Sequence, residues 1–247
     1  MAGILHHALP AVIVAIDGPA GSGKSTVSRR VARRLGWDHL DTGAFYRAAT
    51  LAVLQAGADP HDPHEVVRAV ADRNFQQEKG RMMIDGEDVS LAIRSAEVTA
   101  WVSPVAAHPE LRALMTAEQQ RWVEARGRDA VVEGRDIGTV VFPQAELKIW
   151  LEASPEERAR RRAAQTGEDE VEVARAIRAR DQADATRSVS PQVPAPDAVH
   201  IDTTDLTVDE VVEAVISHLP PPATEGSVGG GGPKGRRGRT EDGRRKT

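Results

Sequence analysis

Short runs of apolar, mostly β-branched residues recur along this chain between longer stretches of helical periodicity. Residues 12–16, 130–132 and 147–151 form three such runs, and residues 198–201 form a fourth. Uninterrupted apolar runs of this length are typical of strands that are buried on both faces of a parallel sheet. We therefore predict that these four segments are strands of one parallel sheet.

The segments between these runs carry apolar residues at helical spacing. Ser154-Pro-Glu-Glu157 is typical of a capped helix start, with proline in the first turn. The predicted helices span residues 27–35, 44–55 and 109–125, one opens at Pro63, one follows Ser154, one runs from a polar break at 166–169 to about Ala185, and the last spans 207–218. Strands that alternate with helices predict an α/β fold with three layers (α/β/α) and right-handed connections.

Three segments fall outside this alternation. Residues 58–95 interrupt it as an insertion, in which residues 74–90 predict a small hairpin around the turn Asp85-Gly86. Residues 1–11 are expected to be a flexible N-terminus. Residues 220–247 combine prolines, a run of four glycines and scattered charge, and this composition predicts a disordered basic tail.

The composition is that of an ordinary globular domain. The chain has 247 residues, of which 40% are hydrophobic and 28% charged, enough for one α/β domain with insertions. The absence of cysteine excludes disulfides and thiolate metal sites. No run reaches the length of a membrane span, and residues 1–10 lack the pattern of a secretory signal. We therefore expect a cytoplasmic protein that does not bind membranes.

The net charge of −5 is unevenly distributed. From Pro220 onward the chain has seven basic and three acidic residues, which leaves a net charge of about −9 on the preceding part. An acidic body argues against broad binding of nucleic acid, which usually needs a basic face. If this part of the chain binds anions, local clusters of arginine must do so.

One motif indicates specific chemistry. Gly18-Pro-Ala-Gly-Ser-Gly-Lys-Ser-Thr26 matches the phosphate-binding loop (P-loop) pattern and lies between a predicted strand and a predicted helix. Its glycines let backbone N–H groups surround a phosphate at the helix N-terminus. Lys24 can reach the transferred phosphoryl group, and the Ser25 hydroxyl can ligate Mg²⁺. The residues predicted to bind the ATP phosphates are Gly18, Pro19, Ala20, Gly21, Ser22, Gly23, Lys24, Ser25 and Thr26.

The motif does not by itself identify the reaction. A glycine-rich turn without a ligand is the simplest alternative, and P-loops also serve GTPases, helicases and transporters. A GTPase would need an Asn-Lys-x-Asp stretch, which this sequence lacks, and a helicase would normally be larger and more basic. The acceptor of the phosphoryl group must therefore be inferred from other residues.

Arginines recur beside small polar residues in four further segments. Phosphoryl transfer needs much positive charge, and the planar arginine fork binds phosphate with two hydrogen bonds. Alternatively, these arginines could lie on solvated helix surfaces in pairs with glutamate. The presence of a P-loop in the same chain favours phosphate binding over this alternative. The segments are residues 41–47 after a short strand, residues 133–139 after a buried strand, Arg158 with Arg161 and Arg162, and Arg180 with Asp184 and Arg187.

Together these segments resemble the signature segments of bacterial cytidylate kinases. The resemblance rests on residues 16–26, 40–47, 84–94, 133–143, 156–162 and 180–187. It covers about residues 12–218 in the order of the family. It implies a P-loop nucleoside monophosphate kinase domain over residues 12–219. The insertion at about 58–95 would bind the monophosphate, and residues 158–170 would form a helical lid.

The resemblance also implies the reaction and the roles of individual residues. The enzyme would transfer the γ-phosphoryl group of ATP to CMP or dCMP with Mg²⁺ bound by Ser25, as a cytoplasmic monomer that binds no nucleic acid. The family pattern places Thr42, Arg47, Arg135, Arg180 and Arg187 around the acceptor phosphate, Ser103, Arg112 and Asp136 at the cytosine, Asp184 at the ribose, and Lys24, Arg135, Arg158 and Arg162 in catalysis.

These roles agree with the chemistry of the base. A carboxylate accepts a hydrogen bond from the cytosine amino group, whereas uracil presents a carbonyl there and would leave Asp136 without a donor. Two structural alternatives remain: Asp136 could form a salt bridge with a neighbouring arginine, and Ser103 could cap a helix before Pro104. Asp17 and Asp41 are assigned no role as a base, because a metaphosphate-like transition state needs little base catalysis.

Other functions remain to be compared with this one. A kinase for UMP, AMP or an acceptor without phosphate is the nearest rival, but the arginines favour a phosphorylated acceptor and Asp136 favours an amino-bearing base. A nucleotide-gated protein that binds RNA through its basic tail is the rival from another class.

The sequence departs from the pattern of the family at two places. The lid segment 165–172 is shorter than that of some family members, and Ala183 and Ala185 stand where some relatives carry arginines.

Overall fold

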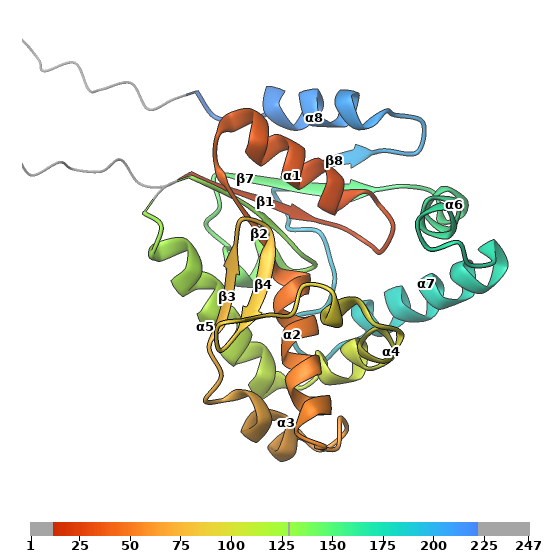
Figure 1. Ribbon diagram of the computed structural model, residues 1–247. Helices are drawn as coiled ribbons and strands as arrows, with labels where there is room; N and C mark the ends of the chain where they lie inside the picture. The colour runs from red at the N-terminus through yellow and green to blue at the C-terminus, as the bar shows by residue number, and fades with distance from the viewer. Residues whose placement is uncertain (1–11, 128, 222–247) are drawn as a thin grey trace, which may run out of the picture.

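The computed structural model describes residues 12–127 and 129–221, and its centre is a five-stranded parallel sheet (Figure 1). The predicted flexible N-terminus and residues 222–247 of the predicted tail lie outside the described residues. The strands, in their order across the sheet, are β2 (Asp38–Asp41), β6 (Ala130–Glu133), β1 (Ile13–Asp17), β7 (Leu147–Glu152) and β8 (Val199–Asp202). All neighbouring strands are parallel, as predicted.

Strand β1 is buried on both faces because alternate side chains enter two separate hydrophobic clusters. Val14 and Ile16 belong to one cluster and Ala15 to the other. Successive residues of a strand point to opposite faces, so a continuous apolar run is required where helices cover both sides. This explains why the apolar runs, which lack alternation, mark the central strands of the sheet.

Helices cover both faces of the sheet and complete the predicted three layers (Figure 1). On one face, α1 (Lys24–Leu35) and α8 (Val208–Ser217) pack through their valines into the cluster with Val14. On the other face, α2 (Thr42–Gln55) and α5 (Pro109–Glu124) contribute Phe45 and residues such as Leu111 to the larger cluster. Within the described residues, no helix has the length and apolar content needed to cross a membrane.

The segment that interrupts the α/β alternation forms a small substructure next to α2. The turn Asp85-Gly86 has positive φ at both residues, 52° and 87°, as a two-residue hairpin turn requires. The predicted hairpin is therefore confirmed, and a third strand extends it. The elements are α3 (Pro63–Val70), the antiparallel strands β3 (Phe75–Glu78), β4 (Arg81–Ile84) and β5 (Glu87–Asp88), and the short 3₁₀ helix η1 (Ala92–Arg94).

The elements that the sequence did not predict include a helix and a π-helical turn. Helix α4 (Ala96–Val105) contains Ser103, so the interpretation of Ser103 as a helix cap is wrong; Ser95 caps this helix by accepting from the Val98 N–H. Pro104 lies in the last turn of this helix and not in the first turn of another one. The second missed element is the π-helical turn η2 (Ile137–Val141).

Two further helices form a hairpin beyond the sheet edge at which β7 ends (Figure 1). Helix α6 (Pro155–Thr166) starts at the predicted cap, where the Ser154 hydroxyl accepts from the Glu157 N–H. It ends at Gly167, whose φ of 73° provides the left-handed residue common at helix ends. Helix α7 (Glu170–Ala185) follows at once and packs along α6. This hairpin brings both arginine-rich helices to the same edge of the sheet.

The packing of α2 on the sheet leads to a test of stability. Phe45 is fully buried in the larger cluster, so Phe45→Ala should leave a cavity and lower the free energy of unfolding by about 3 to 5 kcal/mol. Urea unfolding with an unchanged m-value measures this loss. As the control, Leu91→Ala removes a side chain that is 89% exposed and should change the free energy by at most about 0.5 kcal/mol. Equal effects of the two substitutions would contradict this account of the core.

Candidate functional site

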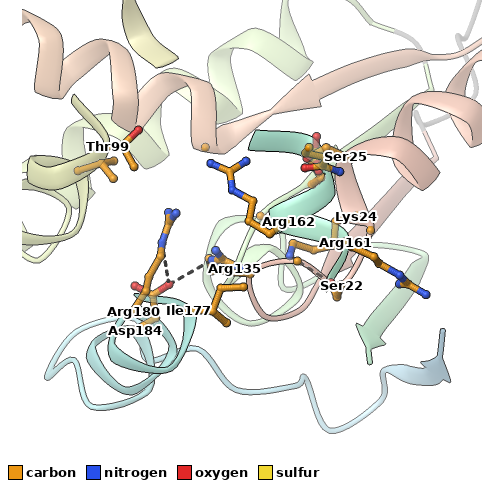
Figure 2. A pocket seen from close by; sticks show the side chains of 18 of the residues that line it. Ser22, Lys24, Ser25, Thr99, Arg135, Arg161, Arg162, Ile177, Arg180 and Asp184 are labelled. Atoms are coloured by element: carbon orange, nitrogen blue, oxygen red, sulfur yellow. Dashed lines mark hydrogen bonds and ion pairs between the residues drawn. The ribbon is translucent and has the colours of Figure 1, made fainter. Parts of the chain in front are cut away.

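A cavity of about 1200 Å³ opens where the strands of the parallel sheet end, between the P-loop, α2, α4 and the α6–α7 hairpin. Figure 2 shows side chains from several of these elements around it. Three of the predicted site residues do not line it: Gly18, Pro19 and Arg158. Those that do line it are Ala20, Gly21, Ser22, Gly23, Lys24, Ser25, Thr26, Thr42, Arg47, Ser103, Arg112, Arg135, Asp136, Arg162, Arg180, Asp184 and Arg187.

The P-loop joins β1 to α1 in a conformation that needs its glycines. A Cβ on Gly18 would lie 2.0 Å from the carbonyl oxygen of Leu151, so no larger residue fits there. Gly23 has a φ of 90° and caps α1 without a side-chain hydrogen bond. The first N–H groups of α1 therefore have no capping side chain, and the helix N-terminus can receive an anion.

Lys24 folds back across the P-loop. Its Nζ donates to the carbonyl oxygen of Pro19 at 2.6 Å and to the Ser22 hydroxyl at 3.4 Å. Burial, followed by repulsion from Arg135, holds the pKa of Lys24 well below its usual value. A phosphate beside this ammonium group would offset both effects, because a nearby negative charge favours the charged form of lysine.

A single buried carboxylate holds three of the predicted arginines. Asp184 is 1% exposed, and its Oδ2 lies 3.2 Å from Arg135 Nε and 3.9 Å from Arg180 Nε (Figure 2). The Arg187 Nη2 donates to the other oxygen, Oδ1. Arg180 and Asp184 lie one turn apart on α7, and Arg187 lies just beyond the end of this helix. The sequence predicted that the three residues lie together, but it applied helical spacing through Arg187; only the fold adds Arg135 to the group.

The guanidinium groups on the cavity wall are crowded. Burial and then Arg135 lower the pKa of Arg180 to about 9, and burial with the charges of Arg94 and Arg162 lowers that of Arg47. Among the described residues, the Arg162 side chain has no hydrogen bond or ion pair, and Figure 2 shows it extending from α6 into the cavity. A cluster of partly desolvated guanidinium groups with net positive charge is suited to phosphate.

Arg112 and Asp136 form a buried ion pair at the other end of the cavity. Arg112 Nη2 lies 2.5 Å from Asp136 Oδ2, and both side chains are 4% exposed. The guanidinium lies 5.0 Å above the ring of Tyr46 and also donates to the carbonyl oxygen of Ala106. The salt bridge considered for Asp136 is therefore present, but both partners line the cavity together with the half-buried Ser103.

Two buried polar atoms near the Arg112–Asp136 pair have no hydrogen bond among the described residues. Within the described part of the chain, Arg112 Nε and the Tyr46 hydroxyl are buried without a hydrogen bond. Buried polar atoms of this kind cost free energy unless they are paired. Their position beside Asp136 supports a polar, planar ligand at this end of the cavity.

Two acidic residues near the P-loop were not predicted to take part in the site. Glu133 ends β6, and its Oε1 lies 3.2 Å from His39 Nε2. Burial raises the pKa of Glu133, but hydrogen bonds from His39 and the Ser25 hydroxyl outweigh it, and the net shift is downward. Asp17 ends β1 and accepts from the N–H groups of Ile137 and Gly138 at 2.9 and 2.8 Å. An acidic residue at the end of a buried strand next to a P-loop is the signal that could have identified both.

Arg158, which the family pattern places in catalysis, does not line the cavity. It is 8% exposed, and its Nη1 donates to the carbonyl oxygen of Ala20 and to Asp181 beneath the P-loop. Arg161 lines the cavity instead, although its guanidinium is bound to Thr203. Helical spacing places these arginines on one face of α6 but does not reveal that the P-loop covers the first turn of that face.

A glycine-rich loop between a parallel strand and a helix, a lysine inside it, and a second cluster of arginines across one cavity define the class of P-loop phosphotransferases. The family model for cytidylate kinase matches residues 14–220 of this chain. The chain belongs to the cytidylate kinase family.

Curated relatives agree with this assignment over most of their length. The chain is 51% identical to a cytidylate kinase of Nocardia farcinica over 211 residues, which is 82% of this chain and 90% of that protein. It is 49% identical to one of Mycobacterium leprae, over 81% of this chain and 92% of that protein. A cytidylate kinase of Streptomyces griseus is 46% identical over 88% of this chain and 96% of its own length.

Asp17 should make stability depend on pH. Burial raises its pKa from 3.8 to about 6, so the native state keeps a proton that the unfolded state has released. The resulting stabilisation is present below about pH 4 and is lost as the pH rises through about 6, with a size on the order of 3 kcal/mol. The free energy of unfolding, measured by urea titration across this range, should fall more steeply for the wild type than for Asp17→Asn. Parallel pH profiles of the two proteins would contradict the raised pKa.

Proposed function

We propose that this chain transfers the γ-phosphoryl group of ATP to CMP or dCMP, giving ADP and CDP or dCDP. One observation carries the proposal: the P-loop and the arginine cluster around Asp184 line the same cavity. Two anion sites that face one enclosed space suit a donor triphosphate and an acceptor monophosphate held end to end. The cytidylate kinase family supplies the identity of the two nucleotides.

At the donor end, residues 18–26 would bind the ATP phosphates. The backbone of the P-loop and the uncapped N-terminus of α1 offer N–H donors. Lys24 would exchange its hydrogen bond to the Pro19 carbonyl for a phosphate oxygen, a stronger partner because it carries negative charge. Gly18 and Pro19 shape the loop from outside the cavity wall.

At the acceptor end, Arg47, Arg135, Arg180 and Arg187 would surround the phosphate of CMP. Asp184 fixes three of them before the substrate arrives, and an oxygen of the same carboxylate can accept from a ribose hydroxyl. Thr42 is also placed at the cavity, but its hydroxyl donates to the Glu133 carbonyl. A hydrogen bond from this hydroxyl to phosphate therefore requires the existing one to break.

The pair Arg112 and Asp136 would read the cytosine, together with Ser103. Asp136 can accept from the exocyclic amino group, while the unpaired Arg112 Nε and the Ser103 hydroxyl can donate to the ring acceptors. Uracil would place a carbonyl oxygen against the buried carboxylate, and two acceptors cannot form a hydrogen bond with each other. A site built around hydrogen bonds discriminates strongly for this reason.

The residues beside the P-loop also fit Mg²⁺. Ser25 lies in the first turn of α1 beside the buried, ionised Glu133, and a hydroxyl plus one or two carboxylates and substrate phosphates is the usual environment of this ion. When bound, Mg²⁺ supplies positive charge to the phosphate oxygens. We propose Ser25 as a ligand and Glu133 as a carboxylate that holds the ligand sphere. Chelation by EDTA in the turnover assay tests the requirement.

Catalysis would rest on position and charge. Lys24, Arg135 and Arg162 lie on the cavity wall between the two anion sites. They can stabilise the negative charge of the phosphoryl group in the transition state of its transfer. A loose transition state needs little proton abstraction, so no residue is given the role of a base. The α6–α7 hairpin, with residues 158–170 as the lid, and the insertion at residues 58–95 would close over the nucleotides and exclude water. Closure would limit the hydrolysis of ATP.

We also propose that the enzyme acts as a monomer in the cytoplasm. The composition without cysteine and the family support a cytoplasmic enzyme. Light scattering coupled to size-exclusion chromatography tests the oligomeric state: a mass near 26.6 kDa agrees with a monomer, and twice that mass excludes one.

The base-reading pair leads to a test of specificity. Asp136→Ala should reduce kcat/KM for CMP by about 10³-fold or more, because the amino group of cytosine loses its acceptor and Arg112 loses its buried partner. The ratio of kcat/KM for CMP to that for UMP should fall as well. ADP release is measured with ATP and each of CMP, dCMP, UMP, AMP, GMP and no acceptor. As a control, Asp72→Ala removes an exposed carboxylate and should leave both values unchanged.

The same panel distinguishes the competing functions. Wild-type turnover confined to CMP and dCMP supports the proposal, whereas equal turnover with UMP or AMP would remove the argument from Asp136. If no acceptor stimulates ADP release, the kinase proposal fails. Salt-dependent RNA binding that disappears on deletion of residues 220–247 would then favour the binding protein.

Arg162 leads to a test of transition-state stabilisation. Arg162→Ala should lower kcat by about 10²-fold or more with little change in KM for either nucleotide, because its charge would stabilise the transferred phosphoryl group in the transition state. Steady-state kinetics measures the two parameters separately. Arg175→Ala on α7 is the matched control, since Arg175 pairs with Glu172 on the exposed face. A rise in KM with unchanged kcat would assign Arg162 to ground-state binding instead.

A further inference from the structure

The two peptide groups on either side of the Ala20 Cα in the P-loop are held by helices α6 and α7. The Ala20 N–H donates to Asp181 Oδ1 of α7 at 3.2 Å. The Ala20 carbonyl oxygen accepts from Arg158 Nη1 of α6 at 3.1 Å. The same Nη1 also donates to Asp181 Oδ2, so the two side chains that hold Ala20 form an ion pair with each other.

Arg158 donates three hydrogen bonds to protein atoms through its Nε and Nη1. Its Nε donates to the carbonyl oxygen of Ala153 at 3.2 Å, and the side chain lies outside the cavity wall. The neighbouring loop residue is equally constrained: a Cβ on Gly21 would lie 2.9 Å from the carbonyl oxygen of Arg158. The P-loop therefore packs directly on the first turn of α6.

We propose that Arg158 and Asp181 are positioning residues that clamp the two peptide groups flanking the Ala20 Cα and connect the α6–α7 hairpin to the ATP site. With these two peptide planes fixed, the N–H groups that follow are held in the orientation in which they meet a phosphate. Arg158 comes from α6 and Asp181 from α7. The arrangement of these two helices therefore determines the conformation in which the P-loop is held. The proposal rests on the proposed function only in that the P-loop binds ATP.

The clamp and a direct phosphate contact by Arg158 predict opposite effects of charge. If Arg158 bound ATP through its positive charge, removal of the negative charge of Asp181 would strengthen ATP binding or leave it unchanged. If the pair acts as a clamp, Asp181→Asn should weaken binding, because the amide presents an N–H group or a neutral oxygen to Arg158. Arg158→Lys separates the two roles in the same way, since lysine keeps the charge but loses the planar fork.

The experiment measures the binding of a non-hydrolysable ATP analogue with Mg²⁺ by isothermal titration calorimetry, without acceptor, to the full chain. Arg158→Ala, Arg158→Lys and Asp181→Asn should each raise the Kd by about tenfold, the size of a lost charge-assisted hydrogen bond. The double variant Arg158→Ala with Asp181→Ala should bind no more weakly than the weaker single variant, because the two residues act as one unit. The Kd for CMP should not change.

Arg175→Ala is the matched control, because it removes an ion pair from the exposed face of α7 and should leave the ATP Kd unchanged. Thermal unfolding verifies that each variant is folded. If Arg158→Ala does not fold, Arg158→Lys and Asp181→Asn still decide the question. Tighter or unchanged ATP binding by Asp181→Asn, or wild-type binding by Arg158→Lys, would overturn the clamp. Failure of CMP phosphorylation by the wild type would instead overturn the proposed function, since ATP binding is measured separately.

Discussion

The structure depends on holding many positive charges around one partly buried cavity before any phosphate neutralises them. Like charges repel strongly where water is partly excluded, and burial disfavours each charged form as well. Burial first, and repulsion from neighbouring arginines second, lower the pKa values of Lys24, Arg47 and Arg180. Buried carboxylates offset the repulsion, and Asp184 does most, because it contacts three guanidinium groups. The result is a set of donors whose positions are fixed in advance and whose remaining positive charge is suited to nucleotide phosphates.

The parallel sheet explains how these charges reach one place. In such a sheet all strands end at the same edge, and the loops that follow them define a crevice. The P-loop follows β1, Arg135 and Asp136 follow β6, and α6 follows β7. The buried residues Asp17 and Glu133 end their strands at this edge and fasten η2 and the Ser25 hydroxyl. The carboxylates at the ends of the strands therefore hold the loops that carry the basic residues of the cavity.

The two ends of the cavity differ in how they are built. At one end, Arg112 and Asp136 are 4% exposed and form an ion pair. At the other end, the P-loop is bound to a two-helix hairpin that extends beyond the sheet, and the Arg162 side chain extends from this hairpin into the cavity without a partner among the described residues. Under the proposed function, the buried pair would read the base and the arginine-bearing hairpin would close over the phosphates.

The sequence by itself determined the α/β class, the P-loop and most segments that bear arginine, because each leaves a local signal. Uninterrupted apolar runs mark strands that are covered on both faces, and glycine spacing marks a loop that must approach an anion closely. Helical spacing also predicted that Arg180, Asp184 and Arg187 lie together, although Arg187 lies beyond the end of α7. Local signals failed at α4, where Ser103 and Pro104 were considered as the start of a helix, and at η2, which has no periodic pattern.

Only the tertiary structure decided what each side chain touches. Arg158 and Arg162 are one turn apart and look equivalent in the sequence, yet one lies beneath the P-loop and the other faces the cavity. Arg135 joins the cluster of Asp184 across 49 positions of the chain, and Glu133 meets Ser25 in the same way. Contacts of this kind depend on how deeply an element packs and which neighbour covers it. Those are properties of the assembled layers and not of any local pattern of residues.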